Sequence, residues 1–517
     1  NPHADLSCAH HSPFGASRGC LCQGGQTSRR GVNEHHQIVI IGAGFAGLGL
    51  AIRLKQAGFN DFVVVEKEAG VGGTWWVNRY PGAACDVQSH LYSLSFAPKS
   101  DWSRQFAPRE EIQGHLEDLV RRHNLEPHIQ LNTDITKAQW DPSDQRWQLT
   151  DAENNRYSAQ ILVGALGGLA RPAWPKIDGL EAFAGRIIHS QQWPADLDLT
   201  DQRVAVIGTG ASAVQFVPHV AQSARSLSVF QRTPNWILPK PDRPIRPIWQ
   251  RLYRLFPPAR YLTRLGLFLL LETRLPAFTR WPRLSTLHRR KALKHLRHQV
   301  TDNGLVEALT PRYAMGCKRV LMSNDYYPTF NLEHVSLVDR PISHITASGI
   351  VDQTGKNHPA DVIILGTGFQ ATSPIPAGLV IGKDQADLGR LWVDGPMAYK
   401  GCTVHGFPNF FMLLGPNTAL GHNSVLLMIE GQIHYIVQAI KKMRARGWRQ
   451  VEISKSAQTQ WNDQLDRTLS GSVWNAGGCQ SWYLHPISGR NTTLWPHTTI
   501  RFKKLTRRFD HEVYACE

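Results

Sequence analysis

Residues 37–68 have the sequence QIVIIGAGFAGLGLAIRLKQAGFNDFVVVEKE, which decides the fold of the first part of the chain. The apolar start is typical of a buried parallel strand, the middle has the periodicity of a helix, and FVVVE is typical of a second strand. The turn before the helix holds Gly42, Gly44 and Gly47 in the pattern G-x-G-x-x-G, and Glu66 ends the second strand. Such glycines bring the backbone close to a pyrophosphate, and such an acid binds a ribose hydroxyl. The stretch therefore predicts a dinucleotide site.

A second unit of the same kind lies at 203–236, RVAVIGTGASAVQFVPHVAQSARSLSVFQRTPNW. Two glycines and an alanine fill its glycine positions, and alanine is allowed at the third. After its second strand, an arginine and a threonine stand where the first unit has an acid. An arginine beside a hydroxyl suits the 2′-phosphate of NADPH, whereas a surface cation at a strand end is the alternative role. The candidate NADPH-binding residues of this unit are Gly208, Gly210, Ser212, Ala213, Arg232 and Thr233.

Two such units predict an α/β fold with two Rossmann-like domains, whose cofactors meet at the interface because one delivers hydride and the other receives it. A third strand-like run, DVIILGTGF at 361–369, is of the first type, and we expect it to return the chain to the first domain. The expected divisions are a disordered leader at 1–36, a first part of an FAD domain at 37–168, an NADPH domain at 169–349 with a helical insertion at about 240–310, and a second part of the FAD domain at 350–517 with a C-terminal substrate loop.

The composition is that of an ordinary soluble protein, with 42% hydrophobic and 19% charged residues in 517. The strongest candidate for a membrane span, LGLFLLL at 265–271, is far shorter than the roughly 18–20 residues that cross a bilayer. None of the eight cysteines forms a C-x-x-C pair. We therefore expect reduced thiols in a cytoplasmic enzyme, and a disulfide oxidoreductase is disfavoured.

The net charge of +16 is unevenly distributed. Between 251 and 300, twelve Lys or Arg residues stand against one acid, Glu272. Our first interpretation is a solvated helical insertion. A weak contact with a membrane surface is the second, because RLGLFLLLETRL at 264–275 mixes apolar and basic residues. We expect no nucleic-acid partner, because no binding motif accompanies the charge.

Two further strings are FAGRIIHSQQWP at 183–194 and GGTWWVNRYPGAACD at 72–86. Together with the order of the two units, they resemble the Baeyer–Villiger monooxygenases, which are class B flavoprotein monooxygenases, over about 37–502. The first string matches F-x-G-x-x-x-H-x-x-x-W-P, and the second matches [AG]-G-x-W-x4-[FY]-P-[GM]-x3-D at every fixed position. The motif residues of the first string are Phe183, Gly185, His189, Trp193 and Pro194.

The resemblance implies an enzyme that uses FAD, NADPH and O2 to insert one oxygen atom next to a ketone carbonyl, through a C4a-peroxyflavin, to give an ester or lactone. It implies that Arg319 is the active-site arginine, that Asp86 lies beside the flavin, and that Lys318 and Arg319 join the NADPH site. A fixed cation suits a peroxide anion, and Asp86 would hold that cation in place. A structural ion pair between domains is the alternative role. The implied FAD-binding residues are Gly42, Gly44, Gly47, Glu66, Lys67, Thr74, Trp75, Asp86 and Tyr92.

Flavin-containing monooxygenases that oxidise N or S atoms are the alternative class, and they lack the acid at position 86. We expect a lipophilic ketone as substrate, because the helical insertion is rich in apolar residues. The C-terminal stretch 478–497 is expected to form a mobile substrate loop, with Trp482 and Arg490 as candidates. Because 183–194 joins the two units, we expect it to act as a hinge, in which His189 reports the position of the NADPH domain.

Two positions depart from the family's usual pattern. Val77 follows Trp76 where the family commonly has Tyr-Trp, and Leu166 stands where the family usually has threonine. Neither departure removes a proposed catalytic group, and both would change the shape of the pocket.

Overall fold

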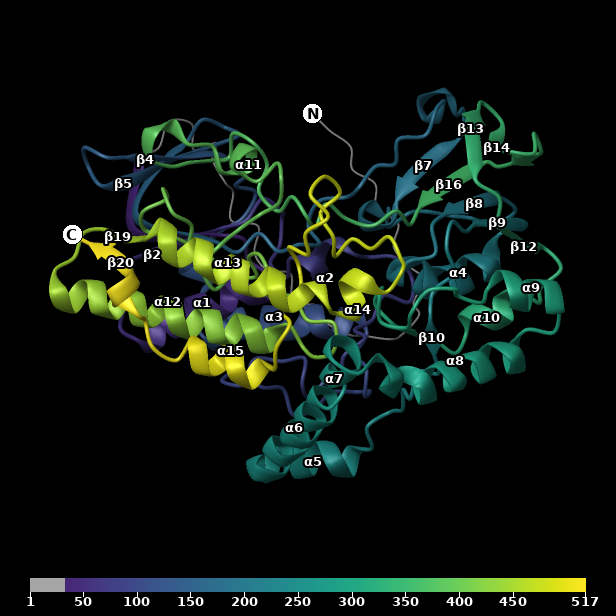
Figure 1. Ribbon diagram of the computed structural model, residues 1–517, viewed down its shortest axis with the longest axis horizontal. Helices are drawn as coiled ribbons and strands as arrows, with labels where there is room; N and C mark the ends of the chain where they lie inside the picture. Colours follow the sequence, from purple (N-terminus) through teal and green to yellow (C-terminus); the bar gives the residue numbers. More distant parts are fainter. Residues whose placement is uncertain (1–32) are drawn as a thin grey trace, which may run out of the picture.

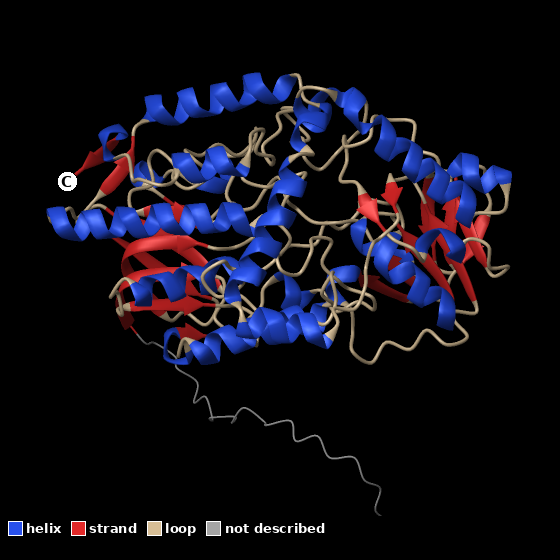
Figure 2. Cartoon of the chain, turned by 90° about the horizontal axis from the view of Figure 1, so that it is seen from below, coloured by secondary structure: helices blue, strands red, loops and turns tan. Residues whose placement is uncertain are grey.

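The computed structural model describes residues 33–517, and its strands gather into two main sheets at opposite ends of the molecule (Figure 1, Figure 2). Residues 1–32 of the expected leader lie outside the described residues. Residues 33–36 already belong to the first strand, which pairs with 156–159, so the ordered chain begins before position 37. The predicted fold class, an α/β fold with two Rossmann-like units and a helical insertion, is confirmed.

The first sheet has the strand order β17-β4-β5-β6-β1-β2-β3, with β18 paired to β6. Its central strands β6, β1 and β2 run parallel, and β4, β5 and β6 form an antiparallel meander. Strands β17 and β18 come from the last third of the chain, so two separate parts of the sequence build this sheet. The bounds are β1 Asn33–Ile41, β2 Phe62–Val65, β3 Ile129–Gln130, β4 Ile135–Asp141, β5 Arg146–Asp151, β6 Arg156–Gly164, β17 Val380–Ile381 and β18 Phe410–Met412.

Helices cover the first sheet and bury the helix of the first dinucleotide unit. Helix α1 is buried along almost its whole length because α3 and α12 pack against it. This explains why its sequence is apolar nearly all round rather than on one stripe. The helices of this part are α1 Phe45–Gln56, α2 Thr74–Val77, α3 Arg109–Arg122, α11 Leu388–Leu391, α12 Leu426–Arg446, α13 Lys455–Ser470, α14 Val473–Ala476 and α15 Thr499–Leu505, followed by the strand pair β19 Val451–Ile453 and β20 Tyr514–Cys516.

The second sheet is entirely parallel and has the order β12-β9-β8-β16-β7. Helix α4 follows β8 and packs on it in the manner of a second dinucleotide unit. A small antiparallel sheet of β13, β14 and β15 precedes β16. The bounds are β7 Arg186–His189, β8 Arg203–Ile207, α4 Ala211–Ser223, β9 Ser226–Phe230, β12 Val335–Val338, β13 Ile342–Thr346, β14 Gly349–Asp352, β15 Asn357–Pro359 and β16 Val362–Leu365.

The run at 361–369 does not return to the first sheet as expected. Its strand β16 lies in the second sheet, between β8 and β7, and the chain re-enters the first sheet only at β17. All four residues of β16 are buried. A short apolar strand of this kind fits the centre of any parallel sheet, so its sequence does not indicate which sheet it joins.

Five α-helices occupy the region of the expected insertion, and α5 and α6 project below the body of the molecule (Figure 1). Among residues 33–517, no helix is both long enough and apolar enough to traverse a bilayer. The helices are α5 Pro247–Leu255, α6 Pro257–Glu272, α7 Leu275–Thr279, α8 Thr286–Gln299 and α9 Asn303–Ala308, and the pair β10 Ile237–Leu238 and β11 Leu321–Met322 with α10 Tyr326–Thr329 flanks them.

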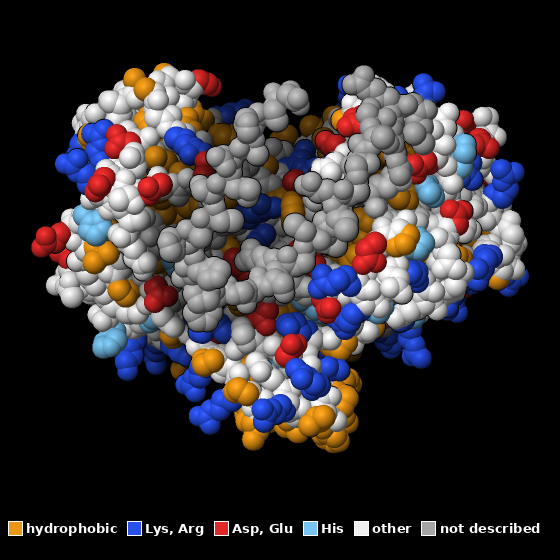
Figure 3. All heavy atoms as spheres, turned by 180° about the vertical axis from the view of Figure 1, so that it is seen from behind, with side chains coloured by type: hydrophobic (Ala, Val, Ile, Leu, Met, Phe, Trp, Pro, Cys, Tyr) orange, Lys and Arg blue, Asp and Glu red, His pale blue; other side chains and the backbone are white. Residues whose placement is uncertain are grey.

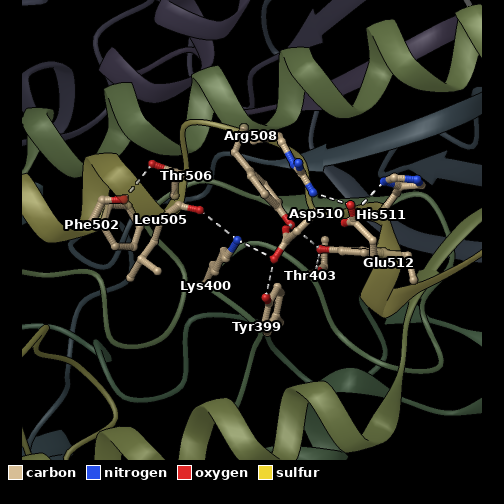
Figure 4. A network of polar contacts seen from close by, with 12 residues as sticks. Tyr399, Lys400, Thr403, Phe502, Leu505, Thr506, Arg508, Asp510, His511 and Glu512 are labelled. Carbon is tan, nitrogen blue, oxygen red and sulfur yellow. Dashed lines mark hydrogen bonds and ion pairs between the residues drawn. The ribbon is translucent and has the colours of Figure 1, made fainter.

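A buried polar network fastens the end of the chain to the first part of the molecule (Figure 4). Lys400 Nζ donates to Asp510 Oδ2 at 2.8 Å and to the carbonyl oxygen of Leu505 at 2.9 Å. The hydroxyls of Tyr399 and Tyr435 donate to the Asp510 carboxylate, each at 2.6 Å. Burial would raise the pKa of Asp510, but the Lys400 charge and these hydrogen bonds outweigh it and lower that pKa. The network holds the chain end against the turn that precedes β18.

Because two histidines are buried, we expect the folded protein to lose stability in acid. No ring nitrogen of His90 or His115 has a hydrogen-bond partner among residues 33–517, and burial lowers the pKa of each to about 4. An unfolded histidine takes up its proton near pH ~6.5, so the unfolded chain binds more protons between that pH and 4. The free energy of unfolding is therefore expected to fall, by up to about 3 kcal/mol per histidine, as the pH drops through this window.

The measurement is urea unfolding at several pH values for the wild type and for His115→Phe. The variant should lose less stability in acid, whereas the exposed replacement His344→Gln should behave as the wild type does. Equal acid sensitivity of His115→Phe and the wild type would contradict the assignment.

Candidate active site

The two glycine turns are built in the same way. Gly42 has a φ of +109° and Gly208 a φ of +105°, a backbone region that favours glycine. A Cβ on Gly42 would lie 2.6 Å from the carbonyl oxygen of Ala165, just after β6. A Cβ on Gly208 would lie 2.5 Å from the carbonyl oxygen of Gly366, just after β16. Each turn thus contacts the end of a neighbouring strand in its own sheet, β6 for the first unit and β16 for the second. This equivalent position explains why 361–369 resembles a part of the first unit.

The other glycine positions have different tasks. A Cβ on Gly47 would lie 1.9 Å from the carbonyl oxygen of Gly42, so this glycine is required by the turn itself. Ala213, at the equivalent position of the second unit, is fully buried. Gly44 and Gly210 are the N-caps of α1 and α4, and no side chain of the described residues caps either helix. A Cβ on Gly210 would meet no atom of residues 33–517 within 4 Å. The backbone amides at both helix starts thus suit a pyrophosphate.

Glu66 lies at the end of β2 and closes the first turn. Its Oε2 accepts a hydrogen bond from the Ala43 amide at 2.7 Å, and its Oε1 accepts one from the Glu68 amide at 3.0 Å. Burial is the largest influence on its carboxyl group and raises its pKa. The acid is therefore fixed beside the glycine turn, where a ribose hydroxyl is expected. Lys67 next to it is exposed and pairs with Glu68 at 3.8 Å.

Aromatic residues gather beside the start of α1. The Trp75 indole donates from Nε1 to the Tyr92 hydroxyl at 3.2 Å, and the Phe45 ring meets the Tyr92 ring edge-on at 5.4 Å. Thr74 begins α2 directly after Gly73. The predicted flavin-lining residues of 72–92 and the first glycine turn are thus brought together, and their apolar, rigid surfaces suit a flat aromatic ring.

Asp86 and Arg319 form a bidentate pair although 233 residues separate them. Arg319 donates from Nε to Asp86 Oδ2 at 2.6 Å and from Nη2 to Oδ1 at 2.8 Å. Burial would raise the pKa of Asp86, but the charge of Arg319 outweighs it and lowers that pKa, and Asp86 in turn raises the pKa of Arg319. Both groups are therefore charged at any working pH. Within residues 33–517, Nη1 makes only a long contact of 3.5 Å, with the carbonyl oxygen of Leu420.

Tyr483 lies near this pair and was not among the predicted site residues. Tyr483 is buried, whereas Trp482 is 45% exposed and packs on it with ring centroids 4.6 Å apart. Burial is the main cause that raises the pKa of Tyr483 to about 12, and the charges of Arg319 and Asp86 also act on it. Its phenol stays protonated. No sequence pattern around Ser481 distinguishes the two aromatic residues.

A disulfide connects the two segments that approach each other here. Cys317 and Cys479 are bonded, with their Cα atoms 6.2 Å apart and 162 residues between them in sequence. The expectation of reduced thiols throughout is therefore wrong for this pair, because the fold and not a local spacing brings it together. Of the other described cysteines, Cys85 and Cys402 are buried. Arg490, the other loop candidate, pairs with Asp466 on α13 and not with the residues around Arg319.

Two of the predicted NADPH-binding residues are neighbouring cations. Lys318 and Arg232 lie close enough for the Arg232 charge to act on Lys318, whose pKa is lowered chiefly by burial and further by that charge. Neither side chain forms an ion pair within residues 33–517. Lys318 Nζ instead lies 5.3 Å from the centre of the Tyr313 ring. Thr233 follows Arg232 in the same turn. Neighbouring cations without a carboxylate suit a dianion such as a phosphate.

The segment 80–84 of the 72–86 string is a contact between the two units. Gln215 on α4 donates from Nε2 to the Ala84 carbonyl oxygen at 2.9 Å and accepts from the Tyr80 hydroxyl at 3.1 Å. A Cβ on Gly82 would lie 2.5 Å from His219 Nε2 on the same helix. Part of this string therefore serves the interface, and the part that ends at Asp86 serves the ion pair. Ser212 lies one turn before Gln215 on α4.

The 183–194 string is built into the second sheet. His189 ends β7, and its side chain is fully buried, with Nε2 3.1 Å from the Gly368 carbonyl oxygen and Nδ1 accepting from the Gln191 amide at 3.1 Å. Burial lowers its pKa, so the ring is neutral. Gly185 is required because its Cβ would lie 2.2 Å from the Asp361 carbonyl oxygen.

The rest of the string packs against the same sheet. Phe183 is buried in the core beside β16, and Trp193, followed by Pro194, packs on Phe216 of α4. No described contact joins His189 to the Asp86–Arg319 pair, and its role as a hinge stays a prediction.

Known proteins resemble the chain over nearly its whole length. Residues 39–256 match the family described as pyridine nucleotide-disulphide oxidoreductase. A protein of Pseudomonas aeruginosa called Baeyer-Villiger monooxygenase is 51% identical, over 93% of this chain and 91% of its own, and one of the same name from Streptomyces coelicolor is 41% identical, over 93% of each.

Solved structures agree with these relatives. An oxidised steroid monooxygenase bound to NADP is 30% identical, with a TM-score of 0.82 over 93% of this chain and 99% of its own. A structure described as an OTEMO complex with FAD and NADP is 27% identical, with a TM-score of 0.84 over 93% of this chain and 99% of its own. A closed form of cyclohexanone monooxygenase is 25% identical, with a TM-score of 0.84 over 94% of this chain and 100% of its own.

Proposed function

The chain belongs to the Baeyer–Villiger monooxygenase family, and from this premise we propose how its own residues carry out the reaction and which ketones they accept. It is an FAD-dependent enzyme that uses NADPH and O2 to insert one oxygen atom next to a ketone carbonyl, which gives an ester or lactone. The relatives favour this activity over oxidation of N or S atoms. When bound, FAD supplies the redox chemistry that passes electrons from NADPH to O2.

FAD is proposed to bind at the first unit. The amides at the start of α1 would hold its pyrophosphate, Glu66 its ribose, and Trp75 with Tyr92 one wall beside its rings. NADPH would bind at the second unit, with its pyrophosphate at the start of α4 and its 2′-phosphate on Arg232, Thr233 and Lys318. The geometry of both glycine turns supports this division, since no side chain of the described residues caps either helix start.

The Asp86–Arg319 pair carries the proposed mechanism. One edge of the guanidinium, formed by Nε and Nη2, binds Asp86, so its plane is fixed, while Nη1 keeps only a long contact within residues 33–517 and has donors for another oxygen. A guanidinium cannot lose its proton at working pH, so it stabilises negative charge that develops on the reacting oxygen. Asp86 balances the charge of Arg319 and sets its direction. Tyr483, as a protonated phenol, would help to exclude water from this side.

We propose a lipophilic ketone as the substrate, and the cytoplasm, where NADPH is regenerated, as the place of action. The side chains around Arg319 support the first point, because Leu420 and Tyr483 are buried and apolar or aromatic. The test is NADPH oxidation by the FAD-loaded protein with linear, cyclic and aryl ketones and with a thioether. We expect each accepted ketone to give the ester or lactone with the same number of carbon atoms, in an amount that matches the NADPH consumed. Sulfoxide from the thioether without any ester would refute the proposal.

Arg232→Ala is expected to raise the KM for NADPH by roughly 10–100-fold, because hydrogen bonds to a charged phosphate are among the stronger ones. The KM for NADH should change little, since NADH lacks the 2′-phosphate. Steady-state kinetics with both cofactors measure the difference. Arg225→Ala, an exposed arginine of the same unit, is the matched control and should affect neither. An equal rise for NADPH and NADH would contradict the assignment of Arg232.

A further inference from the structure

Helices α5 and α6 carry an exposed apolar surface, which we call the apolar tip. The side chains are unusually open: Leu255 is 81% exposed, Ile248 71% and Leu262 62%. Figure 3 shows hydrophobic side chains gathered at the lowest point of the molecule, with cations around them. The exposed members are Ile248, Trp249, Leu252, Leu255, Phe256, Tyr261, Leu262, Leu265, Leu269 and Leu270.

This surface does not suit an insertion that is merely solvated. A solvated helix has polar residues outward and apolar residues inward. Here α5 buries only Tyr253, and α6 buries only Leu271 and Glu272 at its last turn, while the remaining apolar residues are exposed or half-buried. Contiguous apolar patches of this kind on a soluble protein mark contact surfaces.

Polar contacts on the inner side hold the tip in this orientation. Arg264 on α6 donates from Nη1 to the carbonyl oxygens of His90, Leu91 and Ser93 at 3.0, 3.1 and 2.8 Å, and from Nη2 to Glu430 Oε1 at 3.2 Å. These bonds fix the helix to the body. The apolar face therefore cannot turn inward by a simple rotation of α6.

Glu272 anchors the end of the same helix. Its Oε1 accepts hydrogen bonds from Asn423 Nδ2 and from the Thr499 hydroxyl, each at 2.8 Å. The single acid of this basic segment is therefore turned into the protein. No acid stands between 243 and 271 in the sequence, so every charged side chain of α5 and of α6 before Glu272 is a cation.

The charges select the partner. Arg246, Arg251 and Arg254 are exposed on and beside α5. Helix α8, on the same underside of the molecule (Figure 1), adds Arg289, Arg290 and other cations. A second copy docked by a two-fold axis would bring like charges together, which is unfavourable. Anionic lipid head groups attract such cations, and exposed Trp and Tyr residues favour the boundary between head groups and acyl chains.

We propose that the apolar tip docks on a membrane surface that contains anionic lipids, with its leucines in the outer part of the acyl layer and its arginines at the head groups. The protein does not span the bilayer. Docking would place the enzyme where lipophilic ketones accumulate, a consequence that rests on the proposed function. The docking itself is measured without any ketone, so its failure and a failure of the proposed function are distinguishable.

The experiment is co-sedimentation of the FAD-loaded full chain with vesicles of phosphatidylcholine alone and of phosphatidylcholine mixed with phosphatidylglycerol. The wild type is expected to bind the mixed vesicles at least about 10-fold more tightly than the neutral ones, because each cation near the surface contributes. The double variant Leu255→Ser, Leu262→Ser should bind the mixed vesicles at least about 10-fold more weakly than the wild type. Arg251→Gln with Arg254→Gln should reduce the preference for phosphatidylglycerol.

The control variant is Ile487→Ser with Leu391→Ser, which removes exposed apolar residues elsewhere and should bind as the wild type does. Wild-type protein that stays in the supernatant with both vesicles would overturn the proposal. An equal loss in the control variant would overturn it too. So would a dimer in analytical ultracentrifugation that Leu255→Ser with Leu262→Ser converts to a monomer, if vesicles bind neither form.

Discussion

Arg319→Ala is expected to lower the rate of ester formation by about 10²–10³-fold, the usual loss when one fixed charge at a developing anion is removed. Reduction of FAD by NADPH should continue, because the 2′-phosphate residues Arg232 and Lys318 remain. Electrons from NADPH then reach O2 without transfer of an oxygen atom to the ketone, so NADPH consumption should yield H2O2 in place of ester. Ester, NADPH and H2O2 are measured together in one reaction with the same ketone.

Arg319→Lys separates charge from geometry. Lysine keeps the positive charge but cannot bind Asp86 with two parallel hydrogen bonds, so its activity should lie between that of the wild type and that of Arg319→Ala. An Arg319→Ala enzyme that still forms ester at the wild-type rate per NADPH would leave the pair with Asp86 as a structural contact between the two units. If FAD reduction by NADPH is slow but the ester formed per NADPH consumed is normal, Arg319 instead acts in NADPH binding alone.

Gly42→Ala and Gly208→Ala are each expected to cause a very large loss, the first in FAD retention and the second in flavin reduction by NADPH. Each residue has a positive φ, and each new Cβ would lie 2.6 Å or less from a backbone carbonyl oxygen that cannot yield easily. Gly42→Ala should abolish retention of FAD. Gly208→Ala should retain FAD, since the first sheet has its own core, but lose reduction by NADPH by more than about 100-fold.

Flavin absorbance of the purified protein and the rate of flavin reduction by NADPH distinguish the two variants. Dithionite should still reduce Gly208→Ala, which shows that its flavin is intact. Gly114→Ala is the matched control on α3 and should lose neither property, because its Cβ would meet no atom of the described residues within 4 Å. The reverse result, with FAD lost from Gly208→Ala only, would exchange the two proposed binding sites.

The sequence could predict the two units because their chemistry is local. Gly42, Gly47 and Gly208 are demanded by contacts within one turn or with a neighbouring strand, and such demands appear at fixed positions in the sequence. The Asp86–Arg319 pair was accessible only through the family resemblance. Nothing in the spacing of residues 233 positions apart indicates that their side chains meet.

The errors share a physical cause. Strand β16 is apolar on both faces, and a fully buried strand has no pattern that identifies its sheet. The bond between Cys317 and Cys479 depends on how two distant loops cross. Which of Trp482 and Tyr483 points inward depends on the path of its loop. In each case tertiary packing decides, and the sequence window around the residue does not contain that information.

The contact of Gln215 with Ala84 has a thermodynamic consequence for catalysis. Ala84 lies two residues before Asp86, so the helix that begins the NADPH site and the acid that aims Arg319 are parts of one continuous structure. If cofactor binding at α4 favours the ordered ion pair through this contact, an ordered ion pair strengthens cofactor binding by the same free energy. The enzyme would then be ready to handle oxygen only while its nicotinamide cofactor is in place.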